Sequence, residues 1–234
     1  MNGGPRSREL FRLAWPSALT LMLQNAYRLN DLYWVGELGG AAGRVGQAAV
    51  GVAGMVTILT LAFYEGLAAG VLAMSARAHG QGHAYRARRV LRLALWVSLL
   101  LAAVVAATGL TTMRFLVDWL IADGPGQAEL AAYLGPIFLG GIFLCLAPVT
   151  SRAFLAMKDT RTPLCLEVGA VALNTSLNAV LVPSLGVAGA AWATVASRKP
   201  PGVWSATSLA PADRKMRRRS WRARPARRSC SRAR

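Results

Sequence analysis

Residues 24–36 read Gln24-Asn-Ala-Tyr-Arg-Leu-Asn-Asp-Leu-Tyr-Trp-Val-Gly36, and they close a long apolar segment that begins near Leu10. The stretch carries amides, an arginine and the carboxylate of Asp31 within a segment of membrane-spanning length. A carboxylate in such a place costs about 3 kcal/mol unless it faces protein or water. Asp31 therefore indicates a functional site, and we expect its face of the helix to look into the protein.

Helical spacing predicts which side chains of this stretch accompany Asp31. Gln24, Tyr27 and Asp31 are separated by three and four residues, so they share one face of a helix. Arg28 precedes Asp31 by three residues and could pair with it, because side chains at this spacing meet. Two interpretations of Asp31 stay open: a functional carboxylate, or a structural ion pair with Arg28.

Composition and charge point to a helical membrane protein with a basic end. Of the 234 residues, 54% are hydrophobic, and the mean hydropathy is +0.38. Long apolar runs with few charges are typical of membrane-spanning helices. The formal charge of +17 is concentrated in residues 198–234, whose 13 basic residues and one acidic residue give +12. Residues 1–197 hold 14 basic and 9 acidic residues, so the body of the chain is nearly balanced.

Apolar periodicity predicts five full spans and one short segment in residues 1–197. A bilayer crossing needs about 20 residues, and the sixth segment is apolar for only about twelve. Arginine-rich and arginine-poor loops alternate, which by the positive-inside rule predicts a cytoplasmic N-terminus. The expected helices cover about 9–35, 47–76, 90–113, 130–156, 164–182 and, incompletely, 186–197.

The sequence changes character within two residues after Ser197. From residue 198 onward it has no apolar period and is rich in Arg, Ser, Ala and Pro. One interpretation is a disordered basic tail that binds anionic lipid or nucleic acid. The other is a frameshift that reads the gene out of frame. We expect the frameshift, because the change falls inside an unfinished helix, and we expect no nucleic-acid partner.

Four segments resemble, in the same order, segments of the multidrug and toxic compound extrusion (MATE) transporters, and together they cover about residues 8–197. Residues 24–36 are similar to the family's first helix. Residues 75–89, SARAHGQGHAYRARR, are similar to its Ser-Arg…Gly-x-Gly…Ala-Arg-Arg connection. Residues 152–163, RAFLAMKDTRTP, and 186–194, GVAGAAWAT, resemble the family's F-R-A-x-G-D-T-R-T-P and G-V-x-G-A-A-x-A-T segments.

The resemblance implies an all-α membrane protein of twelve helices in two six-helix lobes related by an internal repeat. Such proteins export organic, often cationic, compounds and other xenobiotics in exchange for H⁺ or Na⁺, here across the plasma (inner) membrane. This chain would be the N-terminal lobe, with its sixth helix truncated. Because alternating access needs two halves that rock against each other, we expect a requirement for the missing C-terminal lobe or a second copy.

The resemblance also implies a cation site in this lobe. Asp31 matches the family's first-helix carboxylate, Asn178 its fifth-helix Asn and Thr194 its sixth-helix Thr. For the two neutral residues the alternative is hydrogen bonding between helices. Asn174 lies on the same helical face as Asn178 and adds an oxygen. Val182 stands where the family often places an acid before a proline, so a second carboxylate is missing from that position.

Other polar residues in the predicted spans leave further alternatives open. Glu65 could supply the second charge of the cation site, or it could face water in a central cavity. With Asp31 as the sole assured acid, we expect H⁺ coupling rather than a multi-ligand Na⁺ site. Gln24 and Tyr27 could line a cavity for organic cations, which favour aromatic faces, or pack against neighbouring helices.

The sequence contains no Walker-type Gly-Lys loop, no Ser-His-Asp arrangement and no zinc-ligand spacing. We therefore expect no enzyme activity, no cofactor and no bound metal. Two rival functions stay open. A lipid-linked oligosaccharide flippase of the same superfamily is favoured by the intramembrane Arg28. A non-transporting membrane protein would instead use its basic tail to bind anionic lipid or RNA.

Overall fold

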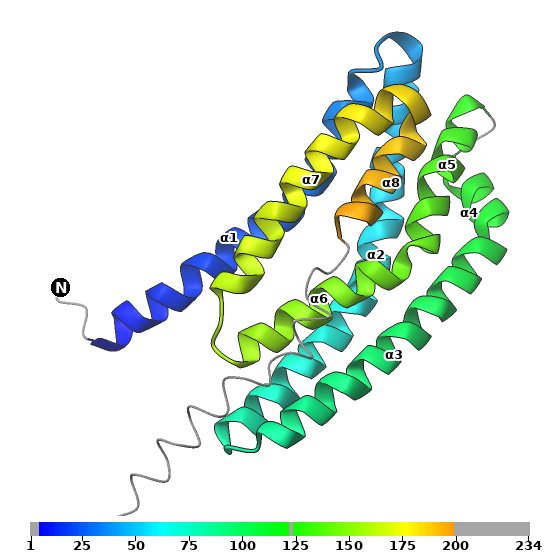
Figure 1. Ribbon diagram of the computed structural model, residues 1–234. Coiled ribbons are helices and arrows are strands. Elements are labelled where there is room, and N and C mark those ends of the chain that lie inside the picture. Colours follow the sequence, from blue (N-terminus) through cyan, green and yellow to red (C-terminus); the bar gives the residue numbers. More distant parts are fainter. Residues whose placement is uncertain (1–4, 122–123, 199–234) are drawn as a thin grey trace, which may run out of the picture. The chain divides into compact units, whose positions relative to one another are not determined.

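The computed structural model describes residues 5–121 and 124–198, which form helices joined by short turns, without a strand (Figure 1). The predicted tail lies outside the described residues, except for Arg198. The expected all-α fold is confirmed. The helices are α1 (Pro5–Gly36), α2 (Gly40–Gly80), α3 (Ala84–Thr111), α4 (Met113–Leu120), α5 (Pro125–Leu139), α6 (Gly141–Ala156), α7 (Arg161–Leu185) and α8 (Val187–Ser197).

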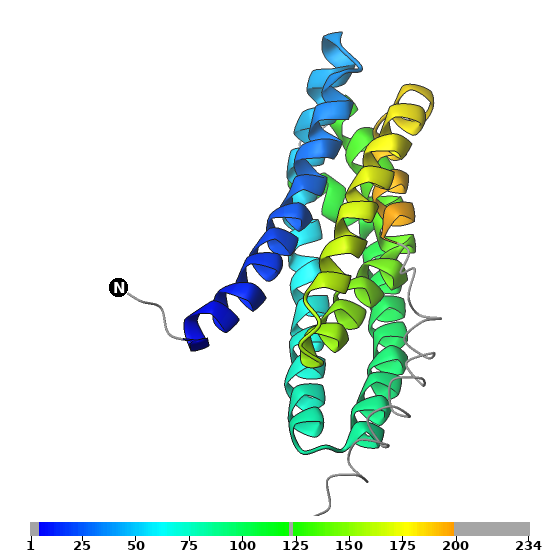
Figure 2. The ribbon, with the colours of Figure 1, turned by 60° about the vertical axis from the view of Figure 1, so that its left-hand side comes forward.

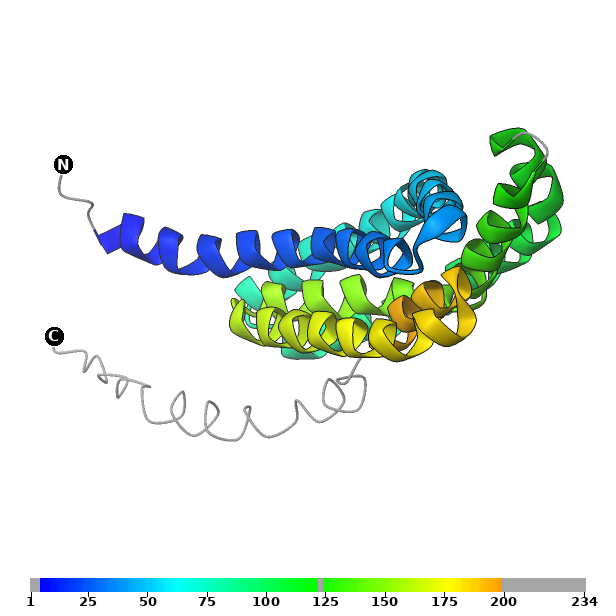
Figure 3. The same ribbon diagram turned by 90° about the horizontal axis from the view of Figure 1, so that it is seen from above.

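The helix α2 packs along four other helices, α1, α3, α5 and α6. Its inward side chains include Ala49, Ala53 and Tyr64, all fully buried. A second set of contacts joins α1 to α7 and α7 to α8, and the views in Figure 2 and Figure 3 show α1 and α7 running side by side. Alanine and glycine on these faces let the helices approach closely, as membrane helices commonly do.

Three helices among the described residues are long and apolar enough to cross a membrane: α2, α3 from Tyr85 onward, and α7. The bent pair of α5 and α6 makes a fourth if it is counted as one span. The sequence predicted five full spans. The fifth is α1, which is not apolar enough to count as a span. Its 32 residues are long enough to cross, but Arg28, Asp31 and three amides make its second half polar. Such a helix needs neighbours that cover its polar face.

The helix predicted over residues 130–156 is broken at Gly140 into α5 and α6, which differ in direction by 54°. A side chain at Gly140 would overlap Val195 of α8, and a Cβ atom at Gly141 would lie 2.9 Å from the Tyr64 hydroxyl of α2. The helix therefore changes direction where two glycines let the backbone pass close to its neighbours. Sequence periodicity missed this bend because both halves are apolar.

A short helix, α4, occupies residues that the sequence predicted as a loop. The segment MRFLVDWL contains no glycine or proline, so nothing in it breaks a helix after the turn at Thr112. Val117 is buried, whereas Phe115 and Trp119 are 73% and 74% exposed. This exposed aromatic pair suits a membrane–water interface.

The helix α8 returns along α7 through a turn at Gly186. Gly186 has φ +61°, a left-handed conformation that glycine adopts without strain. Gly189 passes so close to α7 that a side chain there would collide with the Leu181 carbonyl oxygen. The tight hairpin brings Thr194 of α8 within hydrogen-bonding distance of Asn174 of α7.

The turn between α6 and α7 combines a strained residue with a helix cap. Lys158 has φ +62°, at the position where the similar family segment has glycine. The Asp159 carboxylate accepts hydrogen bonds from the N–H groups of Arg161 and Thr162, both at 3.1 Å, and from the Thr162 hydroxyl at 2.6 Å. Burial raises the pKa of Asp159, but these hydrogen bonds outweigh it and leave the pKa below its ordinary value. Asp159 therefore caps α7 as a carboxylate.

We expect Lys158→Gly to stabilise the chain by about 1 kcal/mol. A left-handed conformation costs a side-chain-bearing residue roughly 1–2 kcal/mol, and the greater freedom of glycine in the unfolded chain offsets part of this gain. Thermal unfolding in detergent should give a higher Tm for Lys158→Gly than for the wild type. Lys158→Ala, which keeps the left-handed backbone, is the control. A Tm for Lys158→Gly at or below that of Lys158→Ala would contradict the prediction.

Candidate functional site

The Asp31 carboxylate is buried, with 1% of the residue exposed, and side chains from three other helices donate hydrogen bonds to it. The Asn178 Nδ2 donates to Oδ1 at 2.9 Å, and the Asn174 Nδ2 reaches the same oxygen at 3.4 Å. The Thr194 and Tyr133 hydroxyls donate to Oδ2 at 2.7 and 2.9 Å. Four donors thus surround one carboxylate contributed by α1. We call Asp31, Tyr133, Asn174, Asn178 and Thr194 the Asp31 cluster.

A further layer of hydrogen bonds orients the Asp31 cluster. The Asn30 Nδ2 donates to the Asn174 Oδ1 at 2.6 Å. The Asn174 Nδ2 also donates to the Thr194 Oγ1 at 3.1 Å. Thr194 can therefore direct its own hydroxyl hydrogen toward Asp31, because its oxygen already accepts from Asn174. Such chains of hydrogen bonds fix the orientation of every member.

The elements of the fold explain why these residues meet. Asn174 and Asn178 are four residues apart in α7 and so share one face, and both are fully buried. The Gly186 turn returns Thr194 to that face, while α5 presents Tyr133 from the side of α2. Four residues that the sequence predicted for a cation site, Asp31, Asn174, Asn178 and Thr194, are thus brought together. Their role as cation ligands stays a prediction.

The alternative interpretation of Asp31 as half of an ion pair with Arg28 is wrong. The Arg28 guanidinium is exposed and donates to the Asn25 Oδ1 at 3.0 Å. One turn of helix carries the two side chains to different faces, one outward and one inward. In the part of the chain that the structure describes, the one ion pair joins Arg152 and Glu65. The Asp31 carboxylate is therefore held by neutral donors alone.

Glu65 does not join the Asp31 cluster. Its Oε2 accepts from the Arg152 Nη2 at 2.8 Å, an ion pair between α2 and α6 in which both side chains are partly exposed. The sequence suggested that Glu65 supplies the second charge of the cation site. In the structure its carboxylate instead pairs with the Arg152 guanidinium. Val182, which stands where the similar family often has an acid, is buried and apolar.

The two residues predicted to line a substrate cavity lie on the same side of α1 as Asp31. Gln24 is half-buried, and Tyr27 is 2% exposed. The Arg198 guanidinium carbon lies 4.2 Å from the centroid of the Tyr27 ring. Tyr27 is thus covered by a cation of the chain itself.

Chemically, the Asp31 cluster offers oxygen atoms and exchangeable hydrogens. The Asn178 Oδ1 is buried without a hydrogen-bond partner among the described residues. No three His, Cys, Asp or Glu side chains gather there or elsewhere in residues 5–121 and 124–198 to hold a transition metal. A proton on Asp31, or a hard cation bound by carboxylate, amide and hydroxyl oxygens, suits this donor set.

Sequence reasoning missed Tyr133 and Asn30. Asn30 was visible as an amide inside an apolar segment, but its helical face differs from that of Asp31. Tyr133 is an aromatic residue in an apolar helix, where packing is the ordinary expectation. A buried tyrosine hydroxyl needs a hydrogen-bond partner, and that requirement was the available signal.

We expect Tyr133→Phe to destabilise the chain by about 1–3 kcal/mol, because it removes one of two donors to a buried carboxylate oxygen. Combining it with Asp31→Asn should cost less than the two single changes added together, since residues in one hydrogen-bond network couple. Thermal unfolding in detergent measures both effects. Tyr33→Phe, on the exposed face of α1, is the matched control. Additive losses would show that Tyr133 acts independently of Asp31.

Comparisons with known proteins identify a matching family and several relatives. The MatE family model matches residues 16–180. The chain is 34% identical over 197 residues to the probable multidrug resistance protein NorM of Bradyrhizobium diazoefficiens, covering 80% of this chain and 40% of that protein. It is 27% identical over 199 residues to the FAD transporter of Shewanella oneidensis, covering 82% and 43%. These relatives are named as resistance or transport proteins, not as enzymes.

Solved structures of transporters share the fold of this chain. An outward-facing multidrug resistance MATE family transporter of the MOP superfamily superposes with a TM-score of 0.75 at 26% identity, covering 87% of this chain and 45% of that one. A MOP superfamily transporter from Pyrococcus furiosus gives 0.75 at 26% identity, covering 86% and 44%. The chain therefore spans less than half the length of the proteins it matches.

Proposed function

Because the chain belongs to the MatE family, we propose that it is the N-terminal lobe of a membrane transporter that exports organic, often cationic, compounds in exchange for H⁺ or Na⁺. In this proposal the Asp31 cluster binds the coupling cation. The observation that carries it is a buried carboxylate held by four neutral donors and by no cation among the described residues. An intramembrane acid in this state supports a proton or ion pathway.

The hydrogen bonds supply a way for cation binding to move helices. An ionised Asp31 accepts from all four donors, so it ties α1 to α5, α7 and α8. A proton on Asp31 turns one acceptor into a donor, and at least one of these hydrogen bonds must then rearrange. Rotation of the Asn178 amide would present its unpartnered Oδ1 to the new hydrogen. Protonation would thereby loosen the contacts between α1 and the α7–α8 hairpin.

A sodium ion would act on the same groups in a different way. Na⁺ needs several oxygen ligands, and the cluster contains the Asp31 carboxylate with the Asn178 and Thr194 oxygens close by. With Val182 in place of an acid, a single carboxylate carries the charge. We therefore propose H⁺ as the coupling ion in preference to Na⁺.

Length supports a role as one half of a transporter. The matched relatives are more than twice as long as the matched segment, since it covers 40–45% of them. Alternating access moves two halves against each other around a central site. We propose that the partner is a C-terminal lobe or, in its absence, a second copy of this chain.

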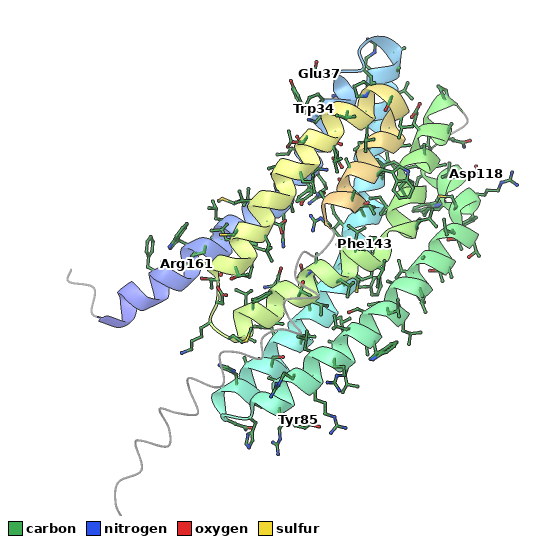
Figure 4. The ribbon with its side chains drawn as sticks, viewed as in Figure 1. Trp34, Glu37, Tyr85, Asp118, Phe143 and Arg161 are labelled. Carbon is green, nitrogen blue, oxygen red and sulfur yellow. The ribbon has the colours of Figure 1, made fainter. Side chains whose placement is uncertain are left out.

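Charge at the two ends of the helices supports a plasma (inner) membrane protein with its N-terminus in the cytoplasm. Exposed arginines gather at the α2–α3 turn, and Lys158 and Arg161 are exposed at the α6–α7 turn. Tyr85 and Arg161 mark these two turns in Figure 4. Glu37 and Asp118 mark the opposite end. A cytoplasmic excess of Lys and Arg is the rule for short loops.

A second candidate, a lipid-linked oligosaccharide flippase, is favoured by one observation. Arg28 lies in the second half of α1 with its guanidinium exposed and bonded only to a neutral amide oxygen among the described residues. A cation in that position could meet a lipid-linked pyrophosphate. The candidate with a lipid- or RNA-binding tail rests on residues outside the described part of the chain.

We expect Asp31→Asn to abolish ethidium efflux from cells that express residues 1–197 joined to a C-terminal lobe. The amide has nearly the same shape but cannot exchange a proton, so coupling is lost while the fold persists. Asp118→Asn, which changes an exposed acid in α4, is the control and should export normally. Efflux unchanged in Asp31→Asn would remove Asp31 from the mechanism.

The chain of 234 residues by itself should export no ethidium. Alternating access needs two lobes that move against each other, and this chain supplies one. Ethidium efflux from cells that express it should therefore equal efflux from cells with an empty vector. A whole-cell fluorescence assay at equal membrane expression checks this. Measurable export by the chain alone, with cross-linking that shows a monomer, would overturn the argument that two halves are required.

A further inference from the structure

The first turns of α3 carry arginines without an acidic partner. Four of them are exposed and form neither an ion pair nor a side-chain hydrogen bond among the described residues: Arg86, Arg88, Arg89 and Arg92. The sequence has no aspartate or glutamate between Glu65 and Asp118. Positive charge therefore accumulates at this end of α3, which Tyr85 marks in Figure 4, and no acid of α3 balances it.

The length of α3 places these arginines at the edge of the bilayer. From Leu93 to Thr111 the helix has 19 residues and no charged side chain. These residues rise about 28 Å, close to the roughly 30 Å of a hydrocarbon core. Arg92 immediately precedes this stretch. Its guanidinium therefore lies at the level of the lipid headgroups when α3 crosses the membrane.

The arginines continue into aromatic and apolar side chains along one face of α3. Arg88, Arg92 and Trp96 follow one another at intervals of four residues, so they form a row along the helix. Trp96 is 67% exposed, and Leu99 and Leu100, one turn further, are 48% and 67% exposed. We call this row, together with the arginine beside it, the α3 stripe: Arg88, Arg89, Arg92, Trp96, Leu99 and Leu100.

The α3 stripe faces away from the other helices. Ala94, Ser98 and Ala102 lie on the opposite side of α3 and are buried, where the helix packs against α2 and α6. In a membrane the stripe therefore meets lipid, with headgroups beside its arginines and acyl chains beside its leucines. Trp96 lies about 6 Å beyond Arg92 along the helix. Tryptophan is enriched at this level, between headgroups and acyl chains.

We propose that the α3 stripe is a binding site for an anionic phospholipid. The three arginines bind the phosphate of the headgroup, and the acyl chains lie along the tryptophan and the two leucines. A guanidinium fork matches two phosphate oxygens at once. A zwitterionic lipid brings its own cation, which the arginines repel, so the site favours a headgroup with net negative charge. The proposal needs only that α3 crosses a membrane, and it is independent of the proposed export.

The number of arginines sets the expected selectivity. One arginine near an anionic lipid surface strengthens binding by about fivefold. Three arginines that act on one headgroup therefore favour an anionic over a zwitterionic lipid by up to about a hundredfold. The acyl chains contribute equally to both lipids, because the leucines and the tryptophan carry no charge.

The first test compares the thermal unfolding of the purified full chain in a neutral detergent with three additives. Dioleoylphosphatidylglycerol should raise the Tm by about 4 °C, as a ligand that binds the folded chain does. Dioleoylphosphatidylcholine has the same acyl chains, and sodium phosphate offers the anion without chains; both should leave the Tm nearly unchanged. No rise with phosphatidylglycerol, or an equal rise with either other additive, would overturn the proposal.

Two triple variants test whether the rise depends on the α3 stripe. The variant that removes the charges of the stripe should lose the rise: Arg88→Gln, Arg89→Gln and Arg92→Gln. The control removes the same number of exposed charges elsewhere and should keep the rise: Arg44→Gln, Arg114→Gln and Arg161→Gln. A rise that the first variant keeps, or that both variants lose equally, would show that the lipid responds to net charge and would overturn the site.

The second test locates the lipid on the wild-type chain in phosphatidylcholine vesicles. The fluorescence of Trp96 is obtained as the difference between the wild type and Trp96→Phe. Phosphatidylglycerol with brominated acyl chains should quench it at a mole fraction at least about fivefold lower than brominated phosphatidylcholine does.

Trp192 of α8 is the control for this second test. It is 42% exposed and has no arginine within five residues on either side, so the two brominated lipids should quench it equally. Its fluorescence is obtained in the same way, with Trp192→Phe. Equal quenching of Trp96 by the two lipids, or the same preference at both tryptophans, would show that the α3 stripe does not select an anionic lipid.

Discussion

A carboxylate without water must be given hydrogen-bond donors by the protein, and the arrangement of the helices around Asp31 follows from that need. Asp31 is buried in α1 and receives one donor from α5, two from α7 and one from α8. Each donor comes from a residue more than 100 positions away in the chain. An unpaired buried charge costs far more than any of these hydrogen bonds contributes alone, so the four helices are held in one arrangement together.

Close helix packing makes that arrangement possible. The bend between α5 and α6 lies at Gly140, where the backbone meets Val195 of α8. The α7–α8 hairpin is tight because Gly189 lies against the Leu181 carbonyl oxygen. A side chain at either glycine would push α8 away and carry Thr194 out of reach of Asp31. Small residues are therefore as necessary to the Asp31 cluster as the polar ones.

Three charged side chains of the bundle, those of Asp31, Glu65 and Arg198, have three different kinds of partner. Asp31 is held by neutral donors, which leaves its charge available for a proton or a cation. Glu65 is neutralised by Arg152, so it links α2 to α6. Arg198 lies over the face of the Tyr27 ring as a cation–π partner. The partners of each group decide its chemistry. The Asp31 carboxylate is open to a proton or a cation, whereas Glu65 is held in an ion pair and Arg198 in a cation–π contact.

The sequence by itself determined the all-α membrane class, the Asp31 site and three of its partners. Apolar runs are local, and a carboxylate in an apolar helix stands out without knowledge of its neighbours. Asn174, Asn178 and Thr194 could be named because their segments resemble a known family. Only the tertiary structure decided the break at Gly140, the donor Tyr133, and the partners of Glu65 and Arg28. Those depend on which side chains meet across long separations in sequence, and the pattern of one helix carries no information about the face of another.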